Sequence, residues 1–257
     1  MAAFNNKSGI ITLSFAISKV SAEIKVIQKT THLVFELIHL NAKNEVNAVI
    51  WGPYPTIIGK TIGEVIGVVR DGEYAIGLQA LNVKTIGGVL KNSEGADYSR
   101  GSVAVSQPYG SSLQAFSLDR SKDRKITVWN QYPNMPVKAI ANETTIGSKI
   151  ALFGCPENQV LARIGAIELA EGLPHPLING LWHKQSPETG RAYMISDFDE
   201  GNIDSLLNYA KQADLMSVYH EGPFQSWGHF VLNPASFPHG NAGMKICVER
   251  HQRKESG

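Results

Sequence analysis

The sequence has no marked excess of charge of either sign. Its 24 Lys and Arg residues stand against 23 Asp and Glu residues, which gives a formal net charge of +1. Proteins that bind nucleic acids need a clear excess of Lys and Arg for their phosphate contacts, so this balance argues against a nucleic-acid partner. Charged residues are 18% of the chain and hydrophobic residues 43%, a composition that argues against a disordered chain.

Long apolar runs are also missing, and cysteines are few. No stretch of about 18 apolar residues occurs, so the sequence predicts no membrane-spanning helix. The two cysteines, Cys155 and Cys247, lack the spacing of a metal site. They are either two buried thiols or a disulfide. The start, MAAFNNKSG, has neither the basic segment nor the apolar block of a secretory signal.

Signature motifs of common enzyme classes are absent as well. The chain has no GxGxxG after a predicted strand, no P-loop, no GxSxG elbow and no HExxH. The histidines near the C-terminal end do not have the spacing of a zinc site, so no metal ligands are predicted. The cofactor therefore stays unknown, although a calcium ion with oxygen ligands is compatible with the sequence.

A period of two dominates from Ile10 to about Ile150. Short apolar runs alternate with Gly, Pro, Asn, Asp or Ser, and Asp71-Gly72 joins two such runs between Thr61 and Leu81. Asp-Gly between alternating apolar residues is a strong signal for a β-hairpin. Many short strands separated by turn residues are typical of an antiparallel sandwich, so residues 1–154 are predicted to form a β-sandwich domain without long helices.

The period changes after Cys155-Pro156. Residues 157–171 carry apolar side chains at spacings of three and four, which fits a helix that ends at Gly172 and Pro174. A loop rich in Pro and Gly follows. We therefore interpret residues 155–190 as a helical linker.

The last part alternates strands and helices. Apolar runs at Ala192–Ser196 and Leu215–Tyr219 predict strands, and Asn202 and Asn241 are placed to cap the helices that follow them. Such a βα-βα order is typical of a parallel sheet or barrel. Because two units cannot close a barrel, residues 191–257 are predicted to be the first two βα units of a TIM-type (β/α) barrel. The chain is then expected to be C-terminally incomplete, with a missing segment of the same protein as its partner.

Ionisable residues follow both predicted parallel strands directly. Catalytic groups of barrels and open parallel sheets lie at the carboxyl ends of strands. Asp197, Tyr219 and His220 are therefore the main catalytic candidates, and Glu221 and Glu200 are weaker ones. A carboxylate pair suits glycosidic-bond hydrolysis, and Tyr and His suit an elimination. In the alternative, Asp197 and Asp199 cap the following helix and His220 only orders its loop.

The long loop after the second strand combines aromatic and polar residues. Aromatic faces stack on the C–H faces of sugar rings, while amide and imidazole groups meet hydroxyls, and long aromatic loops are often functional. A neutral polyhydroxylated substrate is therefore expected, although the loop could instead pack its own aromatics. The predicted substrate-binding residues are Phe224, Trp227, His229 and Asn233 of the loop, together with Asp199.

Four segments carry a resemblance to known proteins: Trp51–Asn82, Ile150–Pro156, Glu171–Pro187 and Gly222–Asn233. The chain resembles glycan-degrading enzymes of Bacteroidetes with an N-terminal sandwich and a barrel, a layout similar to glycoside hydrolase families 36 and 97. It also resembles polysaccharide lyase family 27, whose members remove terminal rhamnose from glucuronate. The resemblance implies a periplasmic or secreted protein with a carbohydrate substrate. In families 36 and 97 the main catalytic carboxylates lie on later barrel strands, which this chain lacks.

The leading hypothesis is therefore an enzyme that cleaves glycosidic bonds in a poly- or oligosaccharide, as a glycoside hydrolase does. A polysaccharide lyase acting on a rhamnose–glucuronate type of linkage is the alternative, and it would need a base and a cation near the uronate carboxylate, for which Tyr219, His220 and Lys184 are suitable types. A non-catalytic glycan-binding protein is the second class. A purely structural role in an assembly is the third.

Overall fold

The structure is a computed structural model that describes residues 1–41, 45–63, 67–88, 103–128, 132–190, 192–226 and 228–255. The chain divides into two compact units, Met1–His175 and Pro176–Gly257. They are called unit 1 and unit 2 here. The division into 1–154, 155–190 and 191–257 stays a proposal.

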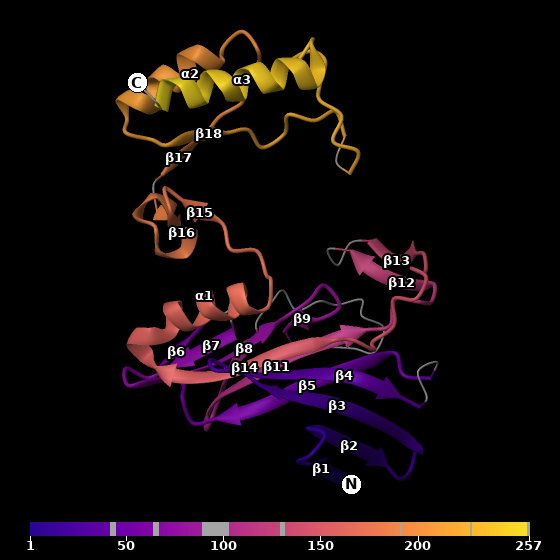
Figure 1. Cartoon of the computed structure of the whole chain (residues 1–257). Coiled ribbons are helices and arrows are strands. Elements are labelled where there is room, and N and C mark those ends of the chain that lie inside the picture. Colours follow the sequence, from indigo (N-terminus) through magenta and orange to yellow (C-terminus); the bar gives the residue numbers. More distant parts are fainter. Residues whose placement is uncertain are drawn as a thin grey trace. The chain divides into compact units, whose positions relative to one another are not determined.

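Unit 1 is built mainly from two antiparallel sheets (Figure 1). The first has eight strands in the order β1-β2-β3-β4-β14-β8-β7-β6, and the second contains β10, β11 and β5, with β9 paired to β11. The strands of the first sheet are β1 (Ala2–Asn5), β2 (Ile10–Phe15), β3 (Val20–Gln28), β4 (Leu33–Leu40), β6 (Thr61–Ile62), β7 (Gly67–Arg70), β8 (Tyr74–Ala80) and β14 (Lys149–Pro156). Those of the second are β5 (Ala48–Thr56), β9 (Ile86–Gly87), β10 (Ala104–Gln107) and β11 (Gly110–Leu118).

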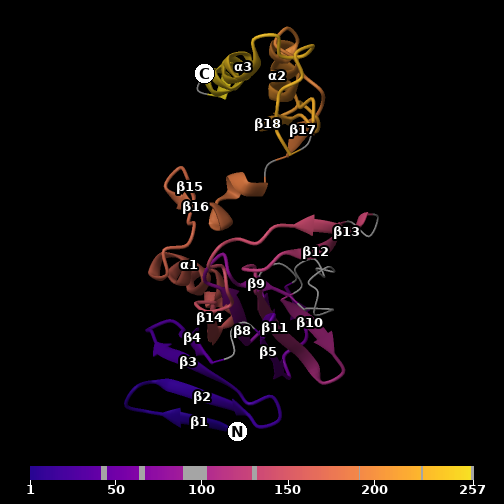
Figure 2. The same ribbon diagram turned by 90° about the vertical axis from the view of Figure 1, so that its right-hand side faces the viewer.

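Residues from both sheets form one hydrophobic core. Leu37, Leu78 and Ile150 of the first sheet are buried in the same cluster as Trp51 and Leu113 of the second. Figure 2 shows the second sheet lying against the first within this unit. The prediction of a sandwich-like domain of antiparallel strands is therefore supported, and no α-helix occurs in the described residues before α1.

The predicted hairpin at Asp71-Gly72 is confirmed. Strands β7 and β8 pair antiparallel on either side of it, with Arg70 opposite Ala75. Asp71 Oδ1 accepts hydrogen bonds from the backbone N–H groups of Glu73 and Tyr74, and these bonds lower the pKa of the Asp71 carboxyl. Gly72 has a φ of +106°, a conformation that glycine adopts without strain.

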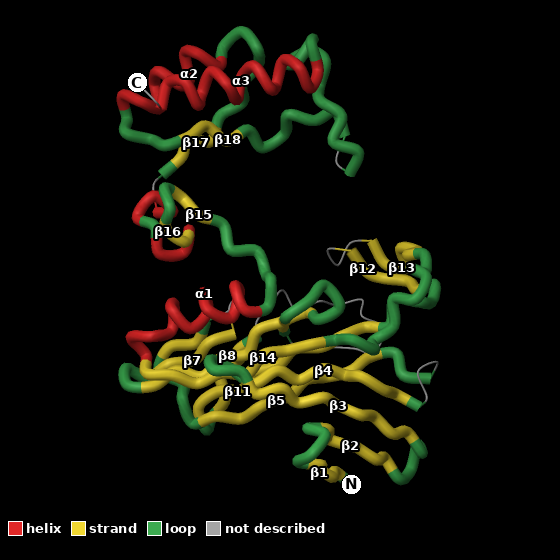
Figure 3. The backbone as a smooth tube through the Cα atoms, in the orientation of Figure 1, coloured by secondary structure: helices red, strands yellow, loops and turns green. Residues whose placement is uncertain are grey.

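A separate hairpin and the first α-helix complete unit 1. The hairpin consists of β12 (Arg124–Val128) and β13 (Tyr132–Val137), and a 3-10 turn, Glu157–Gln159, leads into α1 (Val160–Ala170). The predicted helix at 157–171 thus exists, and Figure 3 shows it against the first sheet. Ile164 and Ile167 are buried, whereas Leu161 and Leu169 of the predicted apolar face are exposed.

A buried carboxylate ties the end of α1 to the sheet. Glu171 Oε1 lies 2.8 Å from Lys29 Nζ and 3.2 Å from His32 Nε2, and Oε2 lies 2.8 Å from Lys149 Nζ. Burial alone would raise the pKa of Glu171, but hydrogen bonds from Lys149, Lys29 and His32 outweigh it and lower the pKa to about 2. Only 2% of the Glu171 side chain is exposed, so these partners replace water around a buried charge.

His32 is held as a neutral group in this network. Burial lowers its pKa more than the hydrogen bond to Glu171 raises it. Its Nε2 faces Glu171, and its Nδ1 lies 2.9 Å from Thr31 Oγ1. We therefore assign the proton to Nε2, which donates to Glu171, while Nδ1 accepts from the Thr31 hydroxyl.

Close packing across β8 and β14 gives a first test of the fold. Gly77 faces Phe153 on the neighbouring strand, and a Cβ at Gly77 would overlap the Phe153 ring. Gly77→Ala should therefore destabilise the protein by about 1–3 kcal/mol, the usual cost of overfilling a packed site. Chemical denaturation measures the loss.

Gly190→Ala is the matched control, because nothing lies within 4 Å of a Cβ placed there. An unchanged unfolding midpoint in Gly77→Ala would contradict the packing of Phe153 over Gly77.

Unit 2 contains two helices and short strands. Its elements are β15 (Leu177–Ile178), β16 (Leu181–Trp182), 3-10 turns at His183–Gln185 and Pro187–Gly190, β17 (Tyr193–Ile195), α2 (Ile203–Gln212), β18 (Ser217–Tyr219) and α3 (Gly240–Glu255). The strand–helix–strand–helix order is as predicted. The TIM-type barrel is not confirmed, because β17 and β18 form a two-stranded sheet and no barrel closes among the described residues.

The helices of unit 2 contribute apolar side chains to one buried hydrophobic cluster. Ile203, Leu207 and Cys247 are buried in one cluster with Leu232 and Phe237. The prediction that Asn241 caps the last helix is wrong, because α3 begins at Gly240 and Asn241 lies inside it. Both cysteines are buried free thiols, so the disulfide alternative is not formed, and burial raises the pKa of each.

None of the helices in the described part of the chain is long and apolar enough to cross a membrane.

Candidate functional site

Strands β17 and β18 bring two of the predicted catalytic residues, Asp197 and His220, together. They pair in parallel, with Tyr193 opposite Ser217 and Ile195 opposite Tyr219. The backbone pairing continues one step, because Ser196 N–H donates to Tyr219 C=O at 3.0 Å. The prediction that the two strands lie side by side and parallel is confirmed. His220 directly follows β18, and Asp197 is the second residue after β17.

Asp197 and His220 meet at these strand ends. Asp197 Oδ1 lies 3.3 Å from His220 Nδ1. The two side chains differ in their access to water, since 89% of the Asp197 side chain is exposed but only 8% of that of His220. The pair therefore combines a solvated carboxylate with a sheltered imidazole.

The backbone decides which nitrogen of His220 carries the proton. The Gly222 N–H donates to His220 Nδ1 at 3.1 Å. A nitrogen that accepts a hydrogen bond carries no proton, so we assign the neutral ring as the Nε2–H tautomer. When the ring takes up a second proton, Nδ1–H can donate to Asp197 in place of accepting from Gly222. The pair can thus hold a proton between an imidazole and a carboxylate, as an acid/base site requires.

Aromatic rings fix the position of the imidazole. The His220 ring packs edge-on against Phe198 at 5.2 Å between centroids and lies 6.3 Å from the Phe237 ring. Phe237 is fully buried, and Phe198 packs on the same core. His220 is therefore anchored to the hydrophobic centre of unit 2, while Asp197 remains open to solvent.

Tyr219 and Glu221 flank His220 in the chain and are both exposed. The Tyr219 ring packs edge-on against Tyr193 of the neighbouring strand at 6.1 Å. Among the described residues, neither side chain forms a hydrogen bond or an ion pair with Asp197. Their catalytic roles stay predictions.

Asp199 and Glu200 are engaged in local structure. Asp199 Oδ1 accepts hydrogen bonds at 2.7 Å from the N–H groups of Gly201 and Asn202. Asn202 stands at the cap position of α2, as predicted, but its side chain makes no capping hydrogen bond to the helix. Its Oδ1 accepts from the Asp199 N–H instead. The two residues thus form a reciprocal turn before the helix. A substrate contact of Asp199 stays a prediction.

Glu200 forms a second histidine–carboxylate pair. Its Oε2 lies 2.7 Å from His239 Nδ1, and its Oε1 accepts from the His239 N–H at 3.0 Å. Hydrogen bonding to His239 lowers the pKa of Glu200. These bonds join the turn before α2 to the start of α3.

The aromatic loop folds back on itself. Phe224 and Leu232 form an isolated antiparallel bridge, and Phe224 packs edge-on against Phe230 at 5.2 Å. Phe224 also packs on the core of unit 2. Part of the loop is therefore ordered by its own aromatic residues, which was the alternative to substrate binding.

The remaining predicted substrate-binding residues differ in their surroundings. Asn233 Oδ1 accepts from Ala235 N–H at 3.0 Å, which orders a turn. His229 is exposed. Trp227 lies outside the described residues. Their contacts with a substrate stay predictions.

Metal binding has no candidate centre in the part of the chain that the structure describes. No group of three or more His, Cys, Asp or Glu side chains there could hold a metal ion.

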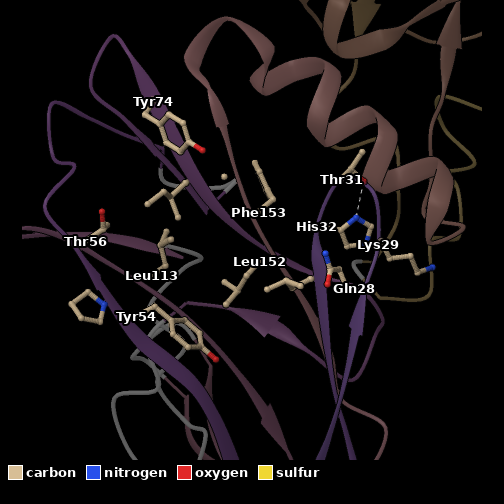
Figure 4. A pocket seen from close by; sticks show the side chains of 14 residues that line it. Gln28, Lys29, Thr31, His32, Tyr54, Thr56, Tyr74, Leu113, Leu152 and Phe153 are labelled. Carbon is tan, nitrogen blue, oxygen red and sulfur yellow. Dashed lines mark hydrogen bonds between the residues drawn. The ribbon is translucent and has the colours of Figure 1, made fainter. Parts of the chain in front are cut away.

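A cavity in unit 1 is lined by none of the residues that the sequence predicted for a functional site. It has a volume of about 480 Å³ and lies between strands of both sheets (Figure 4). Its lining comes from β3, the β3–β4 turn, β4, β5, β8, β11 and β14. No sequence signal identifies it, because the lining residues are scattered over the chain and meet only once the sheets have formed.

Comparisons with known proteins give little. The sequence matches no model of a known protein family and no curated protein. Among solved structures, the α-galactosidase from Lactobacillus brevis covers 98% of this chain at 9% identity with a TM-score of 0.35. This chain spans 38% of the length of that one. The neighbour is a glycoside hydrolase, but a likeness this distant carries no argument about what this chain does.

Proposed function

We propose that this chain acts on a carbohydrate and cleaves glycosidic bonds, with Asp197 and His220 as its acid/base pair. The observation that supports the proposal is the 3.3 Å contact between their side chains at the carboxyl ends of β17 and β18. Strand ends of this kind hold the reacting groups in parallel-sheet enzymes. The periplasmic or secreted location implied by the family resemblance belongs to the same proposal.

The pair offers the two proton-transfer roles that glycoside hydrolysis needs. A protonated His220 can give a proton to the leaving oxygen, and the exposed Asp197 carboxylate can take one from water. Glycosidases usually divide these roles between two carboxylates. Glu221 is exposed next to His220 and is the second carboxylate that we propose for the site.

Elimination at a uronate is the second candidate reaction. The observation that favours it is that Asp197 faces an imidazole rather than another carboxylate. In the neutral His220 ring Nδ1 is the nitrogen that can take up a proton, so the Gly222 N–H has to release it before the imidazole removes the proton beside the uronate carboxyl group. Tyr219 can then protonate the leaving oxygen. Lys184, whose Nζ lies 5.1 Å from the centre of the Trp182 ring, is the cation that we propose for the uronate carboxylate.

Product analysis tests both reactions. The full chain is incubated with neutral and uronate-containing oligosaccharides, and new reducing ends are measured together with ultraviolet absorption. Hydrolysis gives reducing ends without absorption, whereas elimination gives an unsaturated uronate that absorbs. If neither product forms from any glycan but oligosaccharides still bind, the chain is a glycan-binding protein and the enzymatic proposal is wrong.

A further inference from the structure

The cavity of unit 1 has the size of a small-molecule site and a mainly apolar wall. Its volume of about 480 Å³ falls in the range of about 300–1,000 Å³ that is usual for such sites. Both sheets contribute to the wall, and in Figure 4 Leu113 of the second sheet lies between the rings of Tyr54 and Tyr74. The other apolar residues of the wall are Leu33, Pro55, Ile76, Leu152 and Phe153.

Several polar side chains of the wall already have partners within the protein. Thr31 Oγ1 lies 2.9 Å from His32 Nδ1, and His32 Nε2 lies 3.2 Å from Glu171 Oε1. Thr56 Oγ1 accepts a hydrogen bond from a backbone N–H at 3.2 Å. Lys29 Nζ pairs with Glu171 at 2.8 Å and points away from the cavity in Figure 4. The protein therefore uses these groups itself.

The rest of the wall offers a polar ligand little in return for its water. As far as the structure describes the chain, no buried side-chain donor or acceptor that lacks a hydrogen-bond partner belongs to the wall. Gln28 and Tyr74 also line the cavity, but both residues are exposed, so water can satisfy them. A ligand with a charge or several hydroxyls in the cavity would lose water without gaining a partner, which costs free energy. An apolar ligand avoids this cost and gains buried area.

We propose that this cavity binds an uncharged small molecule with a hydrocarbon body, which packs against the apolar side chains of both sheets. Affinity then follows the apolar surface that the ligand buries, and each additional CH₂ group strengthens binding about fourfold. The sign of a charge on the ligand has little influence, because the wall presents no free ionic partner. This site is independent of the proposed glycan cleavage.

Binding of straight-chain alcohols to the full chain tests the proposal by calorimetry. 1-Octanol should bind with a Kd of about 1 mM or tighter, and about tenfold more tightly than 1-hexanol, which has two fewer CH₂ groups. Octanoate and octylammonium carry opposite charges on tails of similar length. Both ions should bind more weakly than 1-octanol, and their Kd values should lie within about threefold of each other.

Leu33→Asp places a carboxylate on the wall. Leu33 is 39% exposed, so the variant should fold, as circular dichroism would show, but bind 1-octanol about tenfold more weakly. Ile38→Asp is the matched control, because Ile38 lies on the same strand, is 38% exposed and does not line the cavity. It should bind 1-octanol as the wild type does.

Gly154→Leu blocks the cavity by volume instead of charge. Gly154 lines the cavity, and a Cβ there would lie 3.3 Å from the Tyr74 ring. A leucine should abolish 1-octanol binding, whereas Gly190→Leu, where nothing lies within 4 Å of a Cβ, should leave it unchanged.

Four results would overturn the proposal. The first is a Kd for 1-octanol weaker than about 10 mM, and the second is equal binding of 1-hexanol and 1-octanol. The third is tighter binding of octanoate or octylammonium than of 1-octanol, or an equal loss of affinity in Ile38→Asp and Leu33→Asp. The fourth is tighter binding of methyl β-galactoside than of 1-octanol, blocked by Gly154→Leu, which would assign the cavity to a sugar.

Discussion

Replacing His220 by alanine or Asp197 by asparagine should lower the turnover of the cleaved glycan about 100-fold or more, the usual contribution of a general acid or base. Each change removes one partner of the 3.3 Å contact. The two effects should not add in the double variant, because the side chains are in contact and belong to one proton-transfer site. Initial rates on the glycan identified by product analysis give the answer.

Two matched controls separate a catalytic loss from a structural one. Asp214→Asn removes another exposed aspartate of unit 2, at a φ of +54° where asparagine is well tolerated. His175→Ala breaks a histidine–carboxylate pair of unit 1, in which His175 Nδ1 lies 3.0 Å from Glu168 Oε2. Both should keep wild-type turnover. Wild-type turnover in His220→Ala and Asp197→Asn would mean that the pair only orders its loop.

Glu171→Gln should produce the largest loss of stability, about 3 kcal/mol. The change removes the carboxylate that pairs with both Lys29 and Lys149, and breaking a buried ion pair leaves an uncompensated charge. Glu157→Gln is the control, because Glu157 pairs with Arg70 at 3.0 Å in a more exposed setting, where an ion pair contributes at most about 1 kcal/mol. Urea denaturation at neutral pH compares the free energies of unfolding.

The same carboxylate makes stability depend on pH. Its pKa is lowered from 4.5 to about 2 in the folded protein, so folding favours the charged form. The contribution of the charged Glu171 to the free energy of unfolding is complete above pH 4.5 and is lost as the pH falls toward 2. The difference in unfolding free energy between wild type and Glu171→Gln should therefore shrink over this range. A difference that stays constant from pH 6 to pH 3 would contradict the assignment of the low pKa.

Local signals in the sequence predicted the elements well. The Asp71-Gly72 hairpin, the helix near 160–170 and the strand–helix alternation of unit 2 each depend on residues close together in the chain. The approach of Asp197 to His220 could also be predicted, because consecutive parallel strands place their carboxyl ends at one edge.

Features that depend on distant residues could not be predicted. Strand β11 is buried along nearly its whole length, serines included, so its two faces show no alternation in the sequence. A register shift between Leu113 and Ala115 adds an irregularity that no pattern reveals. Glu171 and the cavity depend on side chains from several strands, and nothing in the local sequence marks them.

The position of β14 has a consequence for how the protein is made. This strand lies between β4 and β8, with Ile150 opposite Phe35 on one side and Ala80 on the other. While the ribosome is still adding residues before Lys149, β4 and β8 therefore each expose an unpaired edge with free backbone donors and acceptors. Such edges attract other strands, and contacts between distant residues form slowly. The nascent chain is thus open to wrong pairing until its central strand emerges, and chaperones that cover exposed strand edges should raise the yield of folded protein.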